Sequence, residues 1–470
     1  MKKKIVSLLL TGVMAVGALA GCGGGQSIAD QQAAADSSTD SAEGGDSADS
    51  TVTMAAADEV DGTEITFWHS MGGVNGQAID ELVNRFNEEN ELGITVVSEY
   101  QGEYDDALNK LRSAQIGNMG ADLVQVYEIG TRFMIDSGWI IPMQEMIDQD
   151  NYDVSQIEPN LAAYYTIDDQ LYSMPFNSST PLMYYNVDMF EKAGITEIPT
   201  SLEGIEAIGD QLLNKGGASE VISLGIYGWF FEQFLGKQGL DYANNGNGRE
   251  EAATAVAFDE NGGAANILNA WKSLSDKGYA PIVGRGGDAG LADFSSGASA
   301  ITLGSTASLK QILQDVNGRF EVGTAYFPSI TDEDQGGVSI GGASLWALNN
   351  NDPKKLRATW EFVKFLISPE SQAYWNAQTG YFPVTVAAQE EQVFKDNIAQ
   401  YPQFQTAIDQ LHDSSPEYVG ALLSVFSEAR DTVESEIESM LNGEVDVDEA
   451  VSNMADTINK SIEEYNLVNG

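Results

Sequence analysis

Cysteine and histidine are almost absent from this chain, which has one cysteine, Cys22, and two histidines, His69 and His412, among 470 residues. A single cysteine excludes an intramolecular disulfide and any zinc or iron–sulfur site built from several thiolates. Two histidines are too few for a histidine metal cluster or a catalytic histidine relay. The sequence therefore predicts no metal site, and we interpret His69 as a hydrogen-bonded structural residue rather than a catalyst.

Basic side chains are also scarce: 23 lysines and arginines face 71 acidic residues, and the formal net charge is −48. Broad binding to nucleic-acid phosphates needs a dense basic surface, so we expect no nucleic-acid partner. The same imbalance argues against a polybasic face that lies on an anionic membrane. Hydrophobic residues make up 43% of the chain, and its length suits roughly two to four folding units.

The N-terminus carries the pattern of a secretory signal. Lysines at positions 2–4 precede an apolar run over residues 5–19, which is shorter than a membrane-spanning helix and ends in small residues. The ending Leu19-Ala20-Gly21-Cys22 resembles the bacterial lipobox. This resemblance implies that residues 1–21 are a lipoprotein signal peptide and that Cys22 becomes the lipidated mature N-terminus. The alternative is that Cys22 is an ordinary residue of a cleaved signal.

Residues 22–63 are predicted to be a flexible acidic linker. From Gly23 to Thr63 the chain has no aromatic residue, no lysine and no arginine. Such a segment cannot bury enough apolar surface to offset the entropy that ordering would remove. Without the three signal lysines, 20 basic residues remain against 71 acidic ones, a net charge of −51. Anionic headgroups repel such a protein, so we expect a lipid anchor to hold it at the extracytoplasmic face of the cell membrane.

From residue 64 onward, short apolar strands alternate with amphipathic helices. Residues 65–68, 94–97 and 122–127 have the apolar runs that are typical of strands. Apolar residues at positions 79, 82, 83 and 86 recur with helical spacing, and a similar pattern predicts a helix from about Val425 to Ile437. The β-α-β-α order predicts a largely parallel sheet covered by helices and, over this length, two α/β lobes.

The catalytic motifs that such a chain could carry are incomplete. Adjacent acidic pairs are interpreted as solvated surface rather than as a glycosidase pair; they are Asp105-Asp106, Asp168-Asp169 and Glu250-Glu251. Segment 284–287 lacks the lysine and hydroxyl ending of a phosphate-binding loop, and segment 331–336 lacks the closing glutamate of a calcium loop. We therefore expect no catalytic residues, no cofactor and no enzymatic activity.

Five clusters of aromatic, glycine and hydroxyl residues stand where a ligand could be bound. Phe67–Met71 and Gln125–Gly130 each place polar residues directly after a predicted strand, and ligands of open α/β sheets bind outside the carboxyl ends of strands. Pro175–Pro181 and Thr379–Pro383 lie where the chain is expected to cross between lobes. Gly341–Trp346 offers bare backbone for the close approach of a ligand.

These five blocks, together with Tyr184-Tyr185-Asn186, resemble in their order the sn-glycerol-3-phosphate-binding proteins of bacterial ABC importers. That family belongs to the sugar-binding class of extracellular solute-binding proteins, and the resemblance extends from about Thr63 to the C-terminus. It implies a periplasmic-binding-protein-like α/β fold, in which two lobes are joined by hinge crossings and enclose a ligand cleft. We expect lobe I to comprise residues 64–177 and 325–379, and lobe II to comprise residues 178–324 and 380–470.

Carried over to matching positions, the resemblance also implies a ligand site with residues from both lobes. Tyr104 and Glu128 would hold the glycerol end and part of the phosphate. Hydroxyls, a glycine N–H and one guanidinium would supply the donors that phosphate oxygens need. The expected ligand-binding residues are Tyr104, Glu128, Ser179, Trp229, Ser305, Gly342, Tyr381 and Arg430.

These residues also have structural interpretations. Tyr104 could support the packing of the helix that it opens, Glu128 could cap a following helix, and Gly342 could serve a tight turn. Tyr381 could belong to the core, and the two serines could be ordinary turn hydroxyls. For Arg430 the structural alternative is a surface salt bridge.

One position departs from the family pattern. The family stacks glycerol between two tryptophans spaced Trp-x-x-Trp, whereas this chain has Ile226 at the first position and Trp229 at the second. Replacing an indole by a smaller aliphatic side chain leaves volume and removes one polarisable wall. We therefore expect a roomier pocket that admits a glycerophosphodiester such as glycerophosphocholine.

The resulting hypothesis is a monomeric, lipid-anchored substrate-binding protein that captures glycerol-3-phosphate or a glycerophosphodiester. The ligand would stabilise a closed form of the two lobes, and this form would dock on the permease subunits of an ABC importer. Two alternatives remain. Aromatic residues such as Tyr164, Tyr165, Trp229 and Trp271 could stack on a neutral oligosaccharide, and a secreted glycosidase or phosphodiesterase would turn over a chromogenic substrate.

Overall fold

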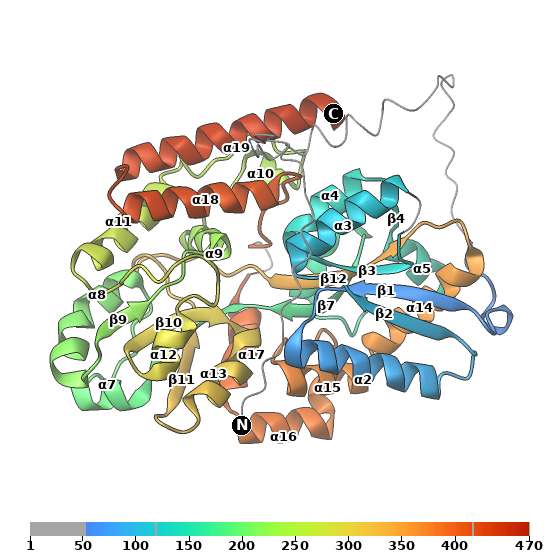
Figure 1. Cartoon of the computed structure of the whole chain (residues 1–470), viewed down its shortest axis with the longest axis horizontal. Helices are drawn as coiled ribbons and strands as arrows, with labels where there is room; N and C mark the ends of the chain where they lie inside the picture. Colours follow the sequence, from blue (N-terminus) through green and yellow to red (C-terminus); the bar gives the residue numbers. More distant parts are fainter. Residues whose placement is uncertain (1–52, 118–119, 416–417, 470) are drawn as a thin grey trace, which may run out of the picture. The chain divides into compact units, whose positions relative to one another are not determined.

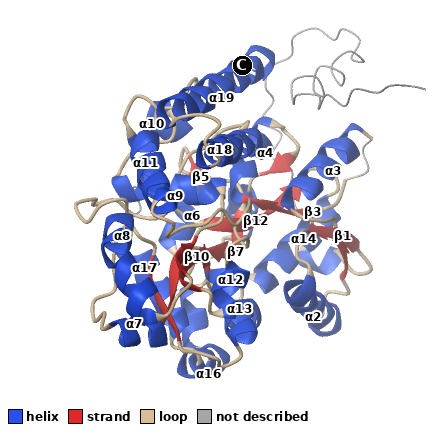
Figure 2. Cartoon of the chain, turned by 60° about the vertical axis from the view of Figure 1, so that its left-hand side comes forward, coloured by secondary structure: helices blue, strands red, loops and turns tan. Residues whose placement is uncertain are grey.

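The computed structural model describes residues 53–117, 120–415 and 418–469. The predicted signal segment, Cys22 and most of the predicted linker therefore lie outside the described residues. Within the described part of the chain, no helix combines the length and the apolar character needed to cross a membrane. The described residues form two main β-sheets with helices packed around them (Figures 1 and 2).

Six strands form the first sheet: β1 (Glu64–His69), β2 (Thr95–Tyr100), β3 (Leu123–Tyr127), β4 (Ile140–Ile141), β7 (Met174–Ser179) and β12 (Gly341–Leu348). The strand order is β2-β1-β3-β12-β4, and β7 pairs with β12 beside this path. The predicted strands at 65–68, 94–97 and 122–127 are confirmed as β1, β2 and β3.

The prediction of a largely parallel sheet is met only in part. β1 is parallel to β2 and β3, whereas β12 is antiparallel to β3, β4 and β7. The end of β7 at Ser179 pairs with the start of β12 at Gly341. The chain therefore leaves the first sheet at the end of β7 and re-enters it beside that end, at the start of β12. As a result, β12 runs antiparallel to both β7 and β3.

Helices on the first sheet include α2 (Gly73–Glu89), α3 (Tyr104–Ile116), α14 (Pro353–Leu366) and α15 (Pro369–Thr379). The helical spacing predicted for residues 79–86 is confirmed, because Ile79, Leu82 and Phe86 are buried along one face of α2. The ring of Phe86 packs edge-on against Phe362 of α14 at 5.0 Å between centroids. The remaining elements around this sheet are η1 (Ala57–Glu59), η2 (Glu128–Gly130), α4 (Thr131–Asp136), α5 (Met143–Asp150), α6 (Pro159–Tyr165), β5 (Thr166–Ile167) and β6 (Gln170–Leu171).

Four strands form the second sheet, in the order β11-β8-β10-β9: β8 (Pro181–Asn186), β9 (Glu220–Ser223), β10 (Ser299–Ser305) and β11 (Val322–Tyr326). The β9–β10 pairing is parallel, and the pairings of β8 with β10 and β11 are antiparallel. Helical elements that follow these strands are α7 (Val187–Ala193), α8 (Leu202–Gln211), η3 (Leu212–Gly216), α9 (Gly228–Gln238), α10 (Asn244–Gly248), α11 (Gly263–Asp276), α12 (Leu291–Ser296), η4 (Thr306–Ser308) and α13 (Leu309–Val316).

The C-terminal part of the chain contains η5 (Val386–Glu390), α16 (Gln392–Gln400), α17 (Gln403–Asp413), α18 (Phe426–Leu441) and α19 (Val447–Asn469). The helix predicted near 425–437 is thus confirmed as α18, which packs along α19 (Figure 1). α17 contributes to both cores, because Ile408 lies in the buried cluster of the first sheet and Phe404 in that of the second. The lobe boundaries expected from the sequence stay a prediction.

The chain crosses between the two sheets beside β7. Only Thr180 separates the end of β7 at Ser179 from the start of β8 at Pro181, so the chain passes from one sheet to the other across a single residue. An isolated antiparallel bridge joins Ser178 to Phe382. The segments predicted to be crossings therefore lie side by side, next to strand ends of both sheets.

Candidate functional site

A cavity of about 860 Å³ lies where these strands end. Its walls include the loop after β1, the start of α3, η2, the end of β7, the start of β12, and residues of α9, α13 and α18. The structure brings together in this one cavity all the ligand-binding residues expected from the sequence: Tyr104, Glu128, Ser179, Trp229, Ser305, Gly342, Tyr381 and Arg430.

Two tyrosines form part of the wall contributed by the first sheet. Tyr104 begins α3, and its ring stacks on Tyr127 with 5.2 Å between centroids and 13° between planes. Asn177 Nδ2 donates a hydrogen bond to Tyr104 Oη at 2.9 Å. Burial raises the pKa of Tyr104 well above its ordinary value, so this hydroxyl stays protonated. Tyr381 is buried and stacks on Trp375, so it belongs both to the core and to the cavity wall.

Arg430 is held by two carboxylates. Its Nη2 donates to Glu128 Oε1 at 2.6 Å, its Nε donates to Glu232 Oε1 at 2.6 Å, and its Nη2 also donates to Glu232 Oε2 at 2.9 Å. Arg430 is 7% exposed, so the surface salt bridge considered for it is wrong. It is a buried arginine in an ion-pair network, which we call the Glu128–Arg430–Glu232 triad.

Electrostatics within the triad are governed by burial and by the ion pairs. Burial raises the pKa of Glu128, and Arg430 opposes this rise. Burial also disfavours the charge of Arg430, but Glu232 and Glu128 outweigh that effect and hold its pKa well above the ordinary value. The guanidinium therefore stays charged. The helix-capping role considered for Glu128 is not observed, because no side-chain cap bond forms at η2.

The cavity wall carries an excess of acidic groups. Three exposed carboxylates, those of Glu103, Asp288 and Asp315, line it together with buried Glu128. Among the described residues of the wall, Arg430 is the one basic side chain. The structure thus offers a phosphate one guanidinium in a negatively charged surrounding.

Two buried donors of the wall have no hydrogen-bond partner among the residues that the structure describes: Ser70 Oγ and Trp229 Nε1. Ser70 is 4% exposed and Trp229 is 3% exposed. Leaving a buried polar group without a partner costs about 1–3 kcal/mol, so such groups in a cavity point to a ligand that accepts hydrogen bonds.

Ser305 and Gly342 also have structural roles. Ser305 Oγ accepts a hydrogen bond from the backbone N–H of Ala307 at 3.2 Å, as a cap of the short helix η4. Gly342 has φ of +91°, and a Cβ placed there would lie 2.0 Å from the carbonyl oxygen of Asn177 on β7. Glycine is therefore required by the close approach of β12 to β7 rather than by a turn. Ser179 is buried at the end of β7.

Ile226 is absent from the cavity wall, and the roomier pocket expected from this position stays a prediction. Ile226 is fully buried, pairs in an isolated bridge with Arg285, and does not line the cavity. Tyr227 stands on the wall next to Trp229 instead, with 6.2 Å between their ring centroids. Ile226 pairs with Arg285 just before α9, and spacing alone does not reveal that its side chain is buried there.

Two further residues of the site were not anticipated. Ser70 could have been found from its place directly after a predicted strand, within one of the quoted blocks. Glu232 is the one acidic residue of the aromatic-rich helix α9, and an isolated acid in such a helix indicates a buried partner. In the described part of the chain, no group of three or more histidine, cysteine or acidic side chains is placed to hold a metal ion.

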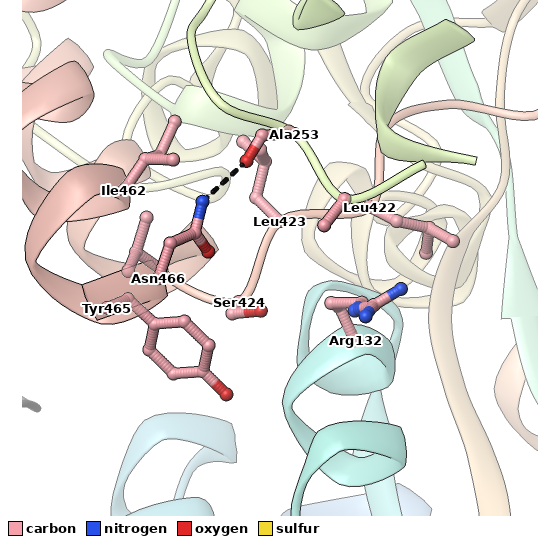
Figure 3. Close-up of a pocket in the computed structure, with 10 residues that line it drawn as sticks. Arg132, Ala253, Leu422, Leu423, Ser424, Ile462, Tyr465 and Asn466 are labelled. Carbon is pink, nitrogen blue, oxygen red and sulfur yellow. Dashed lines mark hydrogen bonds between the residues drawn. The ribbon is translucent and has the colours of Figure 1, made fainter. Parts of the chain in front are cut away.

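A separate and much smaller cavity lies beside α19 (Figure 3). It measures about 10 Å³, and Arg132, Ser424 and Tyr465 are among its lining residues. In Figure 3, Asn466 Nδ2 donates to the carbonyl oxygen of Ala253 at 3.1 Å. This space holds one water molecule at most, so it is a packing defect rather than a ligand site.

Comparison with known proteins gives a consistent result. The family model described as bacterial extracellular solute-binding protein matches residues 81–406. The sn-glycerol-3-phosphate-binding periplasmic protein UgpB of Salmonella typhimurium is 33% identical over 416 residues, which cover 86% of this chain and 93% of that protein. The protein of the same name from Yersinia pseudotuberculosis is 32% identical over 399 residues, which cover 83% and 90%.

Solved structures agree on the fold. UgpB from Mycobacterium tuberculosis, determined in complex with glycerophosphocholine, has a TM-score of 0.72 and 24% identity and covers 86% of this chain and 99% of that chain. The cyclic alpha-maltosyl-1,6-maltose binding protein from Arthrobacter globiformis has a TM-score of 0.69 and 22% identity, with 85% and 99% covered.

Proposed function

Because the chain belongs to the family of bacterial extracellular solute-binding proteins, we propose that it is the substrate-binding component of an ABC importer for phosphate esters of glycerol. The names of its relatives at 32–33% identity support this substrate class. Solute-binding proteins of this family are binding proteins rather than enzymes.

The observation that carries the proposal is the set of donors around the cavity. Ser70 Oγ and Trp229 Nε1 are buried without partners among the described residues, and Arg430 Nη1 makes no hydrogen bond to any residue that the structure describes. A phosphate ester has several acceptor oxygens, and it is therefore suited to a wall that offers such donors. The carboxylate of Glu128 is suited to accept hydrogen bonds from glycerol hydroxyls.

Charge favours a phosphodiester within this substrate class. The exposed acids Glu103, Asp288 and Asp315 stand on the cavity wall, where they would attract a cationic headgroup. Aromatic faces attract quaternary ammonium groups as well, and Tyr100 and Tyr227 are among the aromatic residues of the wall. Glycerophosphocholine combines an acceptor-rich centre with such a headgroup, and 860 Å³ exceeds what glycerol-3-phosphate alone needs.

The proposal includes capture, anchoring and delivery. The ligand would contact both predicted lobes and stabilise their closed form, which docks on the permease subunits. The lipobox-like sequence supports lipidation of Cys22, with residues 1–21 as signal peptide and 22–63 as linker, on the extracytoplasmic face of the membrane. The predicted lobes, 64–177 with 325–379 and 178–324 with 380–470, would move about the crossing beside β7.

A neutral oligosaccharide is the second candidate ligand. Rings of Tyr104, Tyr127, Tyr227, Trp229 and Tyr381 line the cavity, and sugars stack on such rings. An acidic wall also repels a neutral sugar less than it repels a phosphate. Titration calorimetry with glycerol-3-phosphate, glycerophosphocholine and maltose separates the candidates, and binding of maltose alone would replace the proposed function by the alternative.

The variant Ser70→Ala tests the site. Removing this donor should weaken binding of a phosphate ester about tenfold, because one hydrogen bond to a charged acceptor is lost. Ser178→Ala is the matched control, since Ser178 Oγ is also buried without a described partner but does not line the cavity. Calorimetry should show unchanged affinity for Ser178→Ala. Equal affinities for the two variants would place the ligand elsewhere.

A further inference from the structure

Glu232 does not line the ligand cavity, yet it determines how Arg430 faces it. Both carboxylate oxygens of Glu232 accept hydrogen bonds from the guanidinium, which is the geometry of an ionised carboxylate paired with an arginine. Glu232 lies on α9 and Arg430 on α18, and these helices pack against each other. A residue of a neighbouring helix that does not line the ligand cavity therefore fixes the position of the arginine.

This pairing decides which donors of Arg430 remain. Glu232 and Glu128 use the Nε–H and both hydrogens of Nη2. The remaining donor nitrogen is Nη1, which forms no hydrogen bond within the described part of the chain. Arginine commonly binds phosphate with two nitrogens at once. Here Glu232 already occupies the side of the guanidinium formed by Nε and Nη2, so a ligand can hydrogen-bond only to Nη1.

The pairing also decides the charge that a ligand meets. Two carboxylates surround one guanidinium, so the Glu128–Arg430–Glu232 triad has a net charge of −1 when both acids are ionised. Behind it, Glu128 and Glu232 line a second cavity of about 110 Å³, and none of the described residues of that cavity is basic. Other ionisable groups that interact with the triad are Glu434 on α18 and a set of tyrosines: Tyr104, Tyr127, Tyr164, Tyr165, Tyr227, Tyr242 and Tyr381.

The charge of the ligand depends on the type of phosphate ester. A phosphate monoester carries about −1.5 to −2 at neutral pH, because its second pKa is about 6. A phosphodiester carries a single negative charge. Each additional negative charge on the ligand is repelled by the uncompensated carboxylate of the triad and by the acids of the wall.

We infer that Glu232 is a positioning residue that determines specificity: it makes the site select singly charged phosphodiesters over doubly charged phosphate monoesters. The inference rests on the proposed function, and it concerns ligand charge rather than ligand size. Glu232 acts through Arg430, whose charge it offsets and whose Nη1 it aims at the ligand.

The test compares two ligands that differ by one methyl group: sn-glycerol-3-phosphate and its methyl phosphodiester. Calorimetric titration at pH 8 should give at least tenfold tighter binding of the diester to the wild-type protein. Glu232→Gln keeps an amide oxygen as acceptor and removes the charge, so the ratio of the two dissociation constants should fall at least fivefold, mainly through tighter binding of the monoester.

Glu434→Gln is the matched control. Glu434 lies one turn after Arg430 on α18 and accepts a hydrogen bond from the N–H of Gly228 at 2.9 Å, but it does not bond to Arg430. This variant should leave the ratio within twofold of the wild-type value. Equal changes in both variants, or no change in Glu232→Gln, would overturn the inference.

The wild-type protein provides a test that does not depend on the folding of any variant. Binding the monoester as tightly as the methyl diester would overturn the inference while leaving the proposed function intact. Failure to bind either ester would overturn the proposed function, and this inference with it.

Discussion

Burial of the His69 side chain should make the stability of this fold depend on pH. This residue ends β1, its side chain is 3% exposed, and its Nδ1 accepts a hydrogen bond from the backbone N–H of Met71 at 3.3 Å. This confirms the structural role predicted from the sequence. Burial lowers the pKa of His69 to about 4, although Asp80 opposes the shift. The imidazole is thus neutral in the folded protein at physiological pH.

The free energy of unfolding should fall as the pH falls from 6.5 towards 4. In that window the unfolded chain protonates His69, with a pKa of about 6.5, while the folded chain does not, so protons favour the unfolded state. Between pH 7 and 4.5 this group accounts for a loss of about 2 kcal/mol. Urea unfolding at pH 7 and 4.5 should show that the free energy of unfolding falls less in His69→Asn than in the wild type, by about this amount. An equal fall in both proteins would contradict the lowered pKa assigned to His69.

At the scale of elements, the contact between β12 and β7 sets the back wall of the cavity. β12 pairs with β7 in a register that shifts between Ala343 and Ser344. Gly342 sits next to this irregularity, with its positive φ and its backbone against Asn177. The backbone of the site therefore depends on a position without a side chain.

Gly342→Ala should destabilise the protein by about 2–5 kcal/mol, because it combines a strained backbone with a clash at the β7 carbonyl. Gly443→Ala is the control: Gly443 has φ of +74°, but a Cβ there meets no atom within 4 Å. Backbone strain alone should cost the control about 1–2 kcal/mol. Denaturant unfolding measures both values, and equal losses would mean that the close approach of the strands is unimportant.

At the scale of the whole molecule, α18 and the segment before it join elements of the two sheets. Arg430 on α18 binds Glu128 next to β3, and Ser427 hydrogen-bonds to Tyr127. Ser424 Oγ donates to Asp136 of α4 at 2.8 Å. These contacts of α18 and of the segment before it lie beside the cavity. A movement of the predicted lobes would rearrange them.

Ligand binding should close the protein. A glycerophosphodiester at 100 times its dissociation constant should stabilise the fold by about 2.7 kcal/mol, and small-angle X-ray scattering should show a smaller radius of gyration. A neutral polyol such as myo-inositol at the same concentration serves as the control and should change neither quantity. Unchanged scattering at a ligand concentration that calorimetry shows to be saturating would refute closure.

Local patterns were enough to predict much of this protein. Apolar periodicity located β1, β3, α2 and α18, because strand and helix spacing depends on neighbouring residues. The order of five sequence blocks indicated the family and the two-lobe α/β fold, and both are confirmed. The resemblance that these blocks indicated supplied eight residues that now line one cavity, four of them within the blocks: Glu128, Ser179, Gly342 and Tyr381. Signal peptide, lipidation and lobe boundaries stay predictions.

Only the tertiary structure decided the electrostatics of the site. Arg430 is separated by 198 residues from Glu232 and by 302 from Glu128, and no local pattern connects the three side chains. The full burial of Ile226 was equally hidden, because its backbone pairs with Arg285, which is distant in the sequence. Spacing along the chain reveals which residue types are available, whereas Coulombic and hydrogen-bond energies depend on distances that exist only after folding.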